Sequence, residues 1–227
     1  MSHPTTAHAA TVEFTAALVR SSQLGQGGTT ATLTLGGFHT SRTGGSGSRP
    51  GRFYQPAGAY GPLAARLGTL SAGEVLTGTA AFHLNQTGLT LLIEEVARVA
   101  PDPARLINDN GGGILLRDGW LGTRARGKLM SKPHLMRLED DTPICNATLG
   151  MTPRRRPEDT PENRPPLIPI ELAVYGPDAL RFAALEAGRY LVVSGALQRR
   201  LISASKQRRP RIEVDHYEAL HLERALL

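Results

Sequence analysis

Disulfide bonds, membrane-spanning segments and secretion signals are all missing from this sequence of 227 residues. Cys145 is the only cysteine, which excludes an intramolecular disulfide. No apolar run approaches the roughly 20 residues needed to cross a bilayer, and the first residues lack a basic segment followed by a hydrophobic one. We therefore expect a cytoplasmic protein with no membrane partner, in which Cys145 is a buried structural thiol rather than a nucleophile.

Signatures of catalysis and of cofactor binding are missing as well. The sequence GxxxxGK[ST], which cradles nucleotide phosphates, does not occur, because the glycines at 111–113 are followed by ILLRDG. The seven histidines are scattered without the spacing of a metal site, and a single cysteine cannot complete one. We expect no catalytic residues, no metal and no cofactor, and therefore a protein that is not an enzyme.

Aromatic residues are scarce, at 5%, and lysine is absent from residues 1–119. That part holds 8 arginines against 7 acidic residues, whereas residues 120–227 hold 18 basic against 13 acidic residues. The excess of positive charge therefore belongs to the second half of the chain. Such asymmetry indicates a polyanionic partner, although a solvated basic face would have the same composition.

One pattern occurs twice, at an offset of 115 residues. Residues 60–73 read YGPLAARLGTLSAG, residues 175–188 read YGPDALRFAALEAG, and a β-rich segment follows each of them. A repeat of this length is a whole folding unit, so the sequence indicates a duplication. The domains that we predict are a disordered leader at 1–10, a first domain at 11–100, a connector at 101–119 and a second domain at 120–227.

Both copies show the same order of predicted elements. The strand candidates of the first copy are TVEFTAALV, TTATLTLGGFHT, RFYQPAGAY, EVLTGTAAFHL and GLTLLIEEVARV, with a short helix from Pro62 to Leu70 between the third and the fourth. In the second copy we expect the helix from Pro177 to Gly188. This is the strand order of the oligonucleotide-binding (OB) barrel. The expected fold is all-β with short helices: two tandem five-stranded OB-fold barrels, each with a helix between strands three and four.

The segment VYGPDALRFAALEAGRYLVVSGALQRR resembles bacterial single-stranded DNA-binding protein, with a hydrophobic-Gly turn, a helix ending in Gly and then Gly-x-Leu. Two such copies with a connector containing GGG resemble the tandem form of the Deinococcus and Thermus lineage, over roughly residues 11–223. The resemblance implies sequence-nonspecific binding and protection of single-stranded DNA in replication, recombination or repair. It also implies a homodimer, which would offer four barrels, and association with the nucleoid.

The end of the sequence differs from the pattern of that family. Its members usually finish with a flexible segment and a short acidic tip that recruits other proteins, whereas this sequence ends HLERALL. We therefore expect no recruitment of partners through an acidic C-terminal tip.

Sequence-neutral binding of single strands needs aromatic faces for the bases and cations for the phosphates. The family places one stacking aromatic seven residues before the turn glycine and another immediately before it. In the first copy these positions hold Tyr54 and Tyr60, and Phe53 is the neighbour of Tyr54. In the second copy they hold Pro169 and Tyr175. Since alternate strand residues face opposite sides, at most one of Phe53 and Tyr54 should face a ligand. For Tyr60 and Tyr175, a core role and a binding role stay open.

Cations gather in and around the two long loops that an OB barrel extends over its ligand, chiefly in the second copy. The candidate phosphate contacts are Arg42, Arg49, Arg52, Arg154, Arg155, Arg156, Arg164, Arg199, Arg200, Lys206, Arg208, Arg209 and Arg211. We predict that the first copy contributes stacking, with Phe38 as a further candidate, and that the second contributes charge.

Two other functions stay open from the sequence. Pro169 in place of a stacking aromatic favours a diverged OB-fold architectural or protein-interaction module that binds nucleic acid only weakly. RNA binding on the same barrel is also compatible with these residues, because stacking and phosphate contacts do not read the 2′-hydroxyl group.

Overall fold

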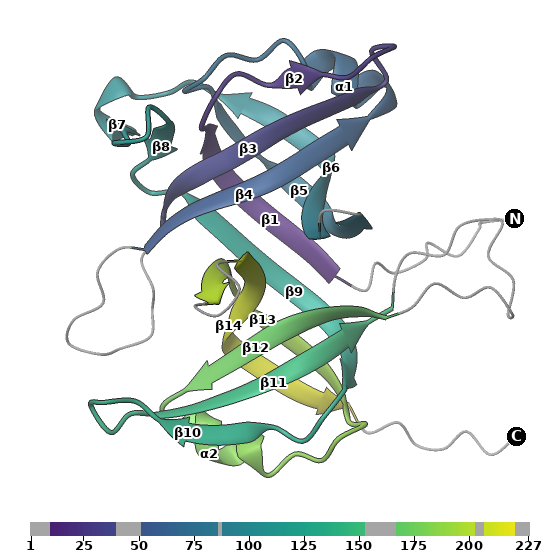
Figure 1. The fold of residues 1–227 in the computed structure, drawn as a ribbon, viewed down its shortest axis with the longest axis vertical. Helices are drawn as coiled ribbons and strands as arrows, with labels where there is room; N and C mark the ends of the chain where they lie inside the picture. The colour runs from purple at the N-terminus through teal and green to yellow at the C-terminus, as the bar shows by residue number, and fades with distance from the viewer. Residues whose placement is uncertain (1–9, 40–50, 86–87, 153–166, 203–206, 221–227) are drawn as a thin grey trace, which may run out of the picture. The chain divides into compact units, whose positions relative to one another are not determined.

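The computed structural model describes residues 10–39, 51–85, 88–152, 167–202 and 207–220 (Figure 1). The chain divides into two compact units. The first unit holds Val12–Gly122 together with Ala196–Arg209, and the second unit holds Met1–Thr11, Thr123–Gly195 and Pro210–Leu227. Within the described residues, no helix is long and apolar enough to cross a membrane.

The first barrel is built from five long strands and one helix. Its elements are β1 (Ala10–Leu18), β3 (Thr30–His39), β4 (Gly51–Tyr60), α1 (Gly61–Leu67), β5 (Val75–Asn85) and β6 (Gly88–Val99), with the short β2 (Gln23–Leu24) beside β3. The pairs β1–β5, β5–β6, β3–β4 and β1–β3 are antiparallel. A parallel contact between β4 and β6, at Ala57 and Leu91, closes the barrel.

The second barrel repeats this topology. Its elements are β9 (Trp120–Leu129), β10 (His134–Arg137), β11 (Pro143–Met151), β12 (Ile168–Tyr175), α2 (Pro177–Ala183), β13 (Tyr190–Ile202) and β14 (Gln207–Leu220). β11 pairs antiparallel with β9, β10 and β12, and β12 pairs in parallel with β14. The predicted fold, two five-stranded OB barrels with a helix after the third strand, is confirmed.

The duplicated pattern of glycines is explained by backbone conformation. Gly61, the first residue of α1, and Gly176, directly before α2, have φ angles of 61° and 67°. Gly73 and Gly188, which lead into the fourth strands, have φ angles of 84° and 86°. Side chains with a Cβ atom rarely adopt this left-handed region, so the same two turns require glycine in each copy.

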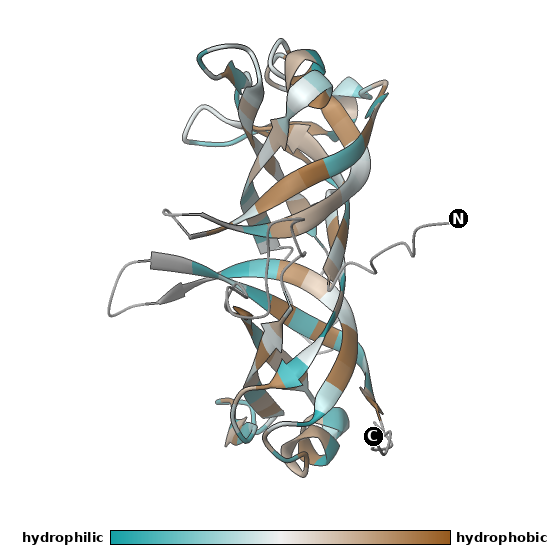
Figure 2. Ribbon diagram, turned by 90° about the vertical axis from the view of Figure 1, so that its right-hand side faces the viewer, coloured by the Kyte–Doolittle hydropathy of each residue, from teal (hydrophilic) through white to brown (hydrophobic). Residues whose placement is uncertain are grey.

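Alternation of buried and exposed residues along the strands produces one core per barrel, and the hydrophobic residues of the strands are brown in Figure 2. Phe14, Leu35 and Leu76 are fully buried in the first barrel, and Leu149 and Phe182 are fully buried in the second. Cys145 lies in the second core, and burial raises the pKa of its thiol. The prediction of a buried structural thiol is confirmed.

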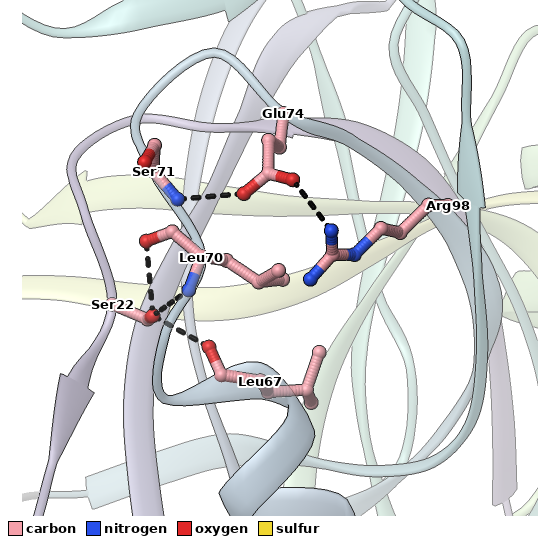
Figure 3. A network of polar contacts seen from close by, with 6 residues as sticks. All are labelled: Ser22, Leu67, Leu70, Ser71, Glu74 and Arg98. Atoms are coloured by element: carbon pink, nitrogen blue, oxygen red, sulfur yellow. Dashed lines mark hydrogen bonds and ion pairs between the residues drawn. The ribbon is translucent and has the colours of Figure 1, made fainter.

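Both helices are shorter than the sequence suggested, since α1 ends at Leu67 and α2 at Ala183. Side chains from outside α1 satisfy the backbone groups around its C-terminus (Figure 3). Ser22 Oγ donates to the carbonyl oxygens of Leu67 and Leu70, at 2.5 and 3.2 Å, and accepts from the Leu70 N–H at 3.1 Å. Glu74 accepts from the Ser71 N–H at 2.6 Å and pairs with Arg98. These contacts replace the helical hydrogen bonds that a longer helix would make.

The connector has structure of its own. A 3₁₀ turn, η1 (Pro103–Arg105), leads into an antiparallel hairpin of β7 (Leu106–Asn108) and β8 (Ile114–Leu116). The hairpin turn is closed by bonds between Asp109 and Gly113 and between Asp109 and Gly112. β8 pairs with β3 at Gly37, so the connector hairpin is part of the first unit.

Candidate nucleic-acid interface

The outer face of β3 and β4 is an uncharged surface over most of its length. Even-numbered residues of both strands face outwards, as the burial patterns show. The strand register places Thr30 opposite Tyr60, Thr32 opposite Gly58 and Thr34 opposite Pro56. Hydroxyl groups, a proline ring and exposed backbone therefore line this part of the sheet.

An open groove of about 410 Å³ lies on this face of the first unit. Its lining includes Arg20, Thr32, Pro56, Tyr60, His83 and Leu92. Tyr60 is 55% exposed and meets His83 edge to face, with ring centroids 6.3 Å apart and planes at 74°. The Thr90 hydroxyl donates to the His83 carbonyl oxygen, which ties β6 to β5 beside these rings. Tyr60 and His83 thus place two aromatic rings in the lining of the groove.

At the other end of the same face, the connector hairpin supplies a carboxylate. Asp109 Oδ2 accepts a 2.7 Å hydrogen bond from the Tyr54 hydroxyl, and Oδ1 lies 2.7 Å from Arg52 Nη1. Arg52 in turn lies over the Phe38 ring, at 5.5 Å from its centroid. The Tyr54 hydrogen bond is the main reason why the pKa of Asp109 is below its ordinary value. Burial, followed by the bond to Asp109, raises the pKa of Tyr54.

Phe53 must be corrected as a stacking candidate. It is 3% exposed and its ring stacks on that of His39, with centroids 6.2 Å apart. A Cβ atom on Gly37 or Gly119 would lie 3.0 Å from the Phe53 ring, so backbone packs against it closely. Phe53 is the inward member of the Phe53–Tyr54 pair and belongs to the core. His39 is buried as well, and burial lowers its pKa.

The corresponding face of the second barrel is occupied by a polar cluster around Arg211. This side chain is 7% exposed and donates to Asn146 Oδ1 and to the Tyr175 hydroxyl, both at 3.2 Å. The guanidinium group lies 5.8 Å from the centre of the Tyr175 ring, and the Tyr175 hydroxyl donates to Glu213 Oε1 at 3.4 Å. Arg211 is therefore a buried structural arginine and not the exposed phosphate contact that the sequence suggested.

Acidic side chains also distinguish the second face from the first. The register pairs Glu171 of β12 with Thr148 of β11 and with Arg211 of β14. By the duplication, Pro169, Glu171 and Ala173 stand where the first barrel has Tyr54, Pro56 and Gly58. Two carboxylates, of Glu171 and Glu213, thus lie on the half-buried part of these strands, where a phosphate backbone would be repelled.

The same architecture is found in a known protein. The wild-type single-stranded DNA binding protein from Thermus aquaticus matches with a TM-score of 0.70 and 16% sequence identity, over 96% of each chain. The fold is the one that this Thermus protein has. A mutant of the Thermus protein that carries a deletion and a substitution matches with a TM-score of 0.68 and 17% identity, over 94% of this chain and 95% of that one. No protein-family model matches the sequence, and neither does any curated protein.

Seven of the thirteen predicted phosphate contacts lie outside the described residues. They are Arg42, Arg49, Arg154, Arg155, Arg156, Arg164 and Lys206. Arg199 and Arg200 lie near the end of β13, and Arg208 and Arg209 lie near the start of β14. The side chain of Arg199 is half-buried and that of Arg209 is exposed. Their role as phosphate contacts stays a prediction.

Sequence reasoning missed three residues of this interface, namely Arg20, His83 and Asp109. Only the fold brings Arg20 and His83 to the groove beside Tyr60. Asp109 carried a signal, because Asp-Asn-Gly is a turn sequence, but nothing in it indicates that the turn lies on Arg52 and Tyr54. Among the described residues, no three His, Cys, Asp or Glu side chains are grouped so as to hold a metal ion.

Proposed function

We propose that this protein binds single-stranded DNA without sequence preference, and that the first barrel makes the contacts with the bases. The observation that carries the proposal is the open groove on β3 and β4, with the exposed Tyr60 ring and His83 at its side. Base stacking on aromatic rings tolerates any sequence, since every base has a π-face. The name of the Thermus protein with the same fold supports this choice of ligand.

The composition of the groove suits a strand that lies with its bases towards the protein. Threonine hydroxyls, a proline ring and glycine backbone offer shallow contacts without a charged wall. Arg20 supplies a cation for the phosphates at the same groove. Such a surface favours neither purines nor pyrimidines strongly, which is the behaviour expected of a protective single-strand binder.

The second barrel has a different part in this proposal. Its corresponding face holds Arg211, Tyr175 and two carboxylates, and Pro169 replaces an aromatic residue. We infer that this barrel contributes positive charge to binding rather than base stacking. The loop arginines 154–156 are part of that charge in our proposal.

Assembly and biological role are extensions of the same proposal. A homodimer would bring four barrels to one strand, and a cytoplasmic, nucleoid-associated protein of this kind would act in DNA replication, recombination or repair. No catalytic step is needed for these roles.

The decisive experiment is a fluorescence-polarisation titration of an unstructured dT oligomer, its duplex and the equivalent RNA, at low and high salt. Tyr60→Leu should weaken dT binding about fivefold or more, because one stack contributes about 1 to 3 kcal/mol. Tyr60→Phe keeps the ring and should bind like the wild type. Tyr60 makes no side-chain capping bond to α1, so neither change removes a helix cap. Equal weak binding of all three nucleic acids, unaffected by Tyr60→Leu, would contradict the proposal.

A second candidate function concerns the second barrel, which the polar cluster makes a poor base binder. β10 pairs only with β11 among the described strands, and its Leu135 and Met136 are 41% and 45% exposed. An edge strand with exposed apolar side chains favours contact with another protein. Weak binding to every nucleic acid in the titration would favour this architectural function.

A further inference from the structure

The first strand of the second barrel carries cations that no binding loop contains. Along β9, the exposed residues alternate with buried ones, and the alternate exposed positions in the second unit are Arg124, Arg126 and Lys128. Three positive charges therefore stand on one face of one strand. We name Arg124, Arg126 and Lys128 the β9 stripe.

These side chains have no partner that explains them. None of the three forms an ion pair or hydrogen bond within the described part of the chain. Other exposed cations of this unit are paired, as in Arg137 with Asp141, Lys132 with Glu186 and Arg181 with Asp178. The β9 stripe is a run of like charges without compensation, which repel one another and attract a polyanion.

The duplication shows that the fold does not require these cations. Leu129 donates to the Arg189 carbonyl and accepts from the Gly188 N–H, both at 2.8 Å, and Leu18 makes the same two bonds with Glu74 and Gly73. Leu18 and Leu129 are therefore equivalent. Counting back from them, the first barrel has Glu13, Thr15 and Ala17 at the positions of the β9 stripe.

The barrel fixes the spacing of the three Cα atoms that carry these side chains. β9 is held by β11 on one side, through Leu129 with Leu149 and Lys128 with Gly150, and it neighbours β13. Alternate residues of a strand are about 6.8 Å apart. That is about twice the 3.4 Å rise per nucleotide of a stacked strand, so an extended strand, in which the rise is larger, can bring successive phosphates within reach of successive cations.

The neighbouring strand adds no negative charge. At the start of β13, the outward residues are Tyr190, Val192 and Ser194, which alternate with buried positions, and Tyr190 is 37% exposed. On the side of β13, the surface beside the β9 stripe is thus neutral.

We propose that the β9 stripe is a second nucleic-acid contact, separate from the groove, which binds the phosphates of an extended single strand one after another. It rests on the proposed function, since it concerns the same ligand. It gives the second barrel a defined part in binding, through phosphates alone and without base stacking.

The test is the salt dependence of dT oligomer binding for the triple variant Arg124→Gln, Arg126→Gln and Lys128→Gln. Each phosphate contact in a single strand contributes about 0.7 to the slope of log K against log salt concentration. The variant should lose about 2 from the magnitude of that slope. A charge-retaining variant, Arg124→Lys, Arg126→Lys and Lys128→Arg, should keep it.

A matched control removes three exposed cations of the same unit that are already paired, by Lys132→Gln, Arg137→Gln and Arg181→Gln. It lowers the net charge equally and should keep nearly the whole slope. An equal loss of slope in the β9 variant and in this control would overturn the proposal. A β9 variant that folds and keeps the wild-type slope would overturn it too. A β9 variant that loses slope for duplex but not for dT would also overturn it. If the wild type itself fails to bind dT, it is the proposed function that fails.

Discussion

The Tyr54 hydroxyl donates a 2.7 Å hydrogen bond to Asp109, which also lies 2.7 Å from Arg52. These two distances join the outer face of β4 to the turn of the connector hairpin. A carboxylate there occupies the donors that a phosphate of bound DNA would use, because both are anionic oxygen acceptors. If the proposed function is right, the connector competes with the phosphates of a bound strand at this end of the face.

We predict that Asp109→Asn increases the affinity for a dT oligomer. The change removes the negative charge and releases Arg52, while an amide oxygen can still accept from Tyr54. Exposed ion pairs are weak, so the gain should be about twofold to fivefold. The matched control is Asp118→Asn, which removes another connector carboxylate, paired with Arg105 at 2.8 Å. An equal gain in both variants would attribute the effect to net charge alone.

The same contact predicts a dependence of stability on acid. The pKa of Asp109 is lowered in the folded protein, chiefly by the Tyr54 hydroxyl, so the stabilisation is present above its ordinary pKa and is lost as the pH falls through the folded value. In denaturant unfolding between about pH 5 and pH 2, the free energy of unfolding should fall less steeply with pH for Asp109→Asn and for Tyr54→Phe than for the wild type. Acid limbs that coincide in all three proteins would contradict this reasoning.

Local signals in the sequence were sufficient for the fold but not for the site. Tyr-Gly-Pro at 60 and 175 marks turns that need glycine, and strand alternation already limited Phe53 and Tyr54 to one outward member. The contact of Asp109 with Tyr54 joins residues 55 positions apart. Charge alone also could not separate Arg211, buried against Tyr175, from the exposed Arg124 two strands away in the barrel order. Such distinctions depend on register and packing, which composition does not contain.

The left-handed glycines lead to a prediction about stability. Gly61→Ala and Gly176→Ala should each lower the free energy of unfolding by about 1 to 2 kcal/mol, because a Cβ atom is disfavoured at these φ angles. No atom lies within 4 Å of the added Cβ at either position, so the loss is purely conformational. The two changes lie in different units and should add in the double variant.

The control for this pair is Gly111→Ala. Gly111 does not have a positive φ, and its nearest contact would be Asp109 Oδ2 at 3.5 Å. In chemical denaturation, the free energy of unfolding of Gly111→Ala should stay within about 0.5 kcal/mol of the wild-type value. Losses of the same size at Gly111 and Gly61 would show that backbone conformation is not the cause.

Ser22 provides the last prediction, since its hydroxyl group bonds to the segment after α1 beside two backbone bonds, from the Leu70 N–H to the Leu67 carbonyl and from the Ser22 N–H to the Leu70 carbonyl. Ser22→Ala removes the donor to the Leu67 and Leu70 carbonyls and the acceptor for the Leu70 N–H (Figure 3). Leu67 and Leu70 would lose the hydroxyl but keep these backbone bonds, so the change should cost about 1 kcal/mol of stability. Ser71→Ala is the control, because Ser71 bonds to Glu74 through its backbone N–H, which alanine keeps. The free energy of unfolding of this variant should stay within about 0.5 kcal/mol of the wild-type value. Amide exchange at Leu70 should accelerate in Ser22→Ala and not in Ser71→Ala. A wild-type exchange rate at Leu70 in Ser22→Ala would mean that the backbone bonds alone hold this segment.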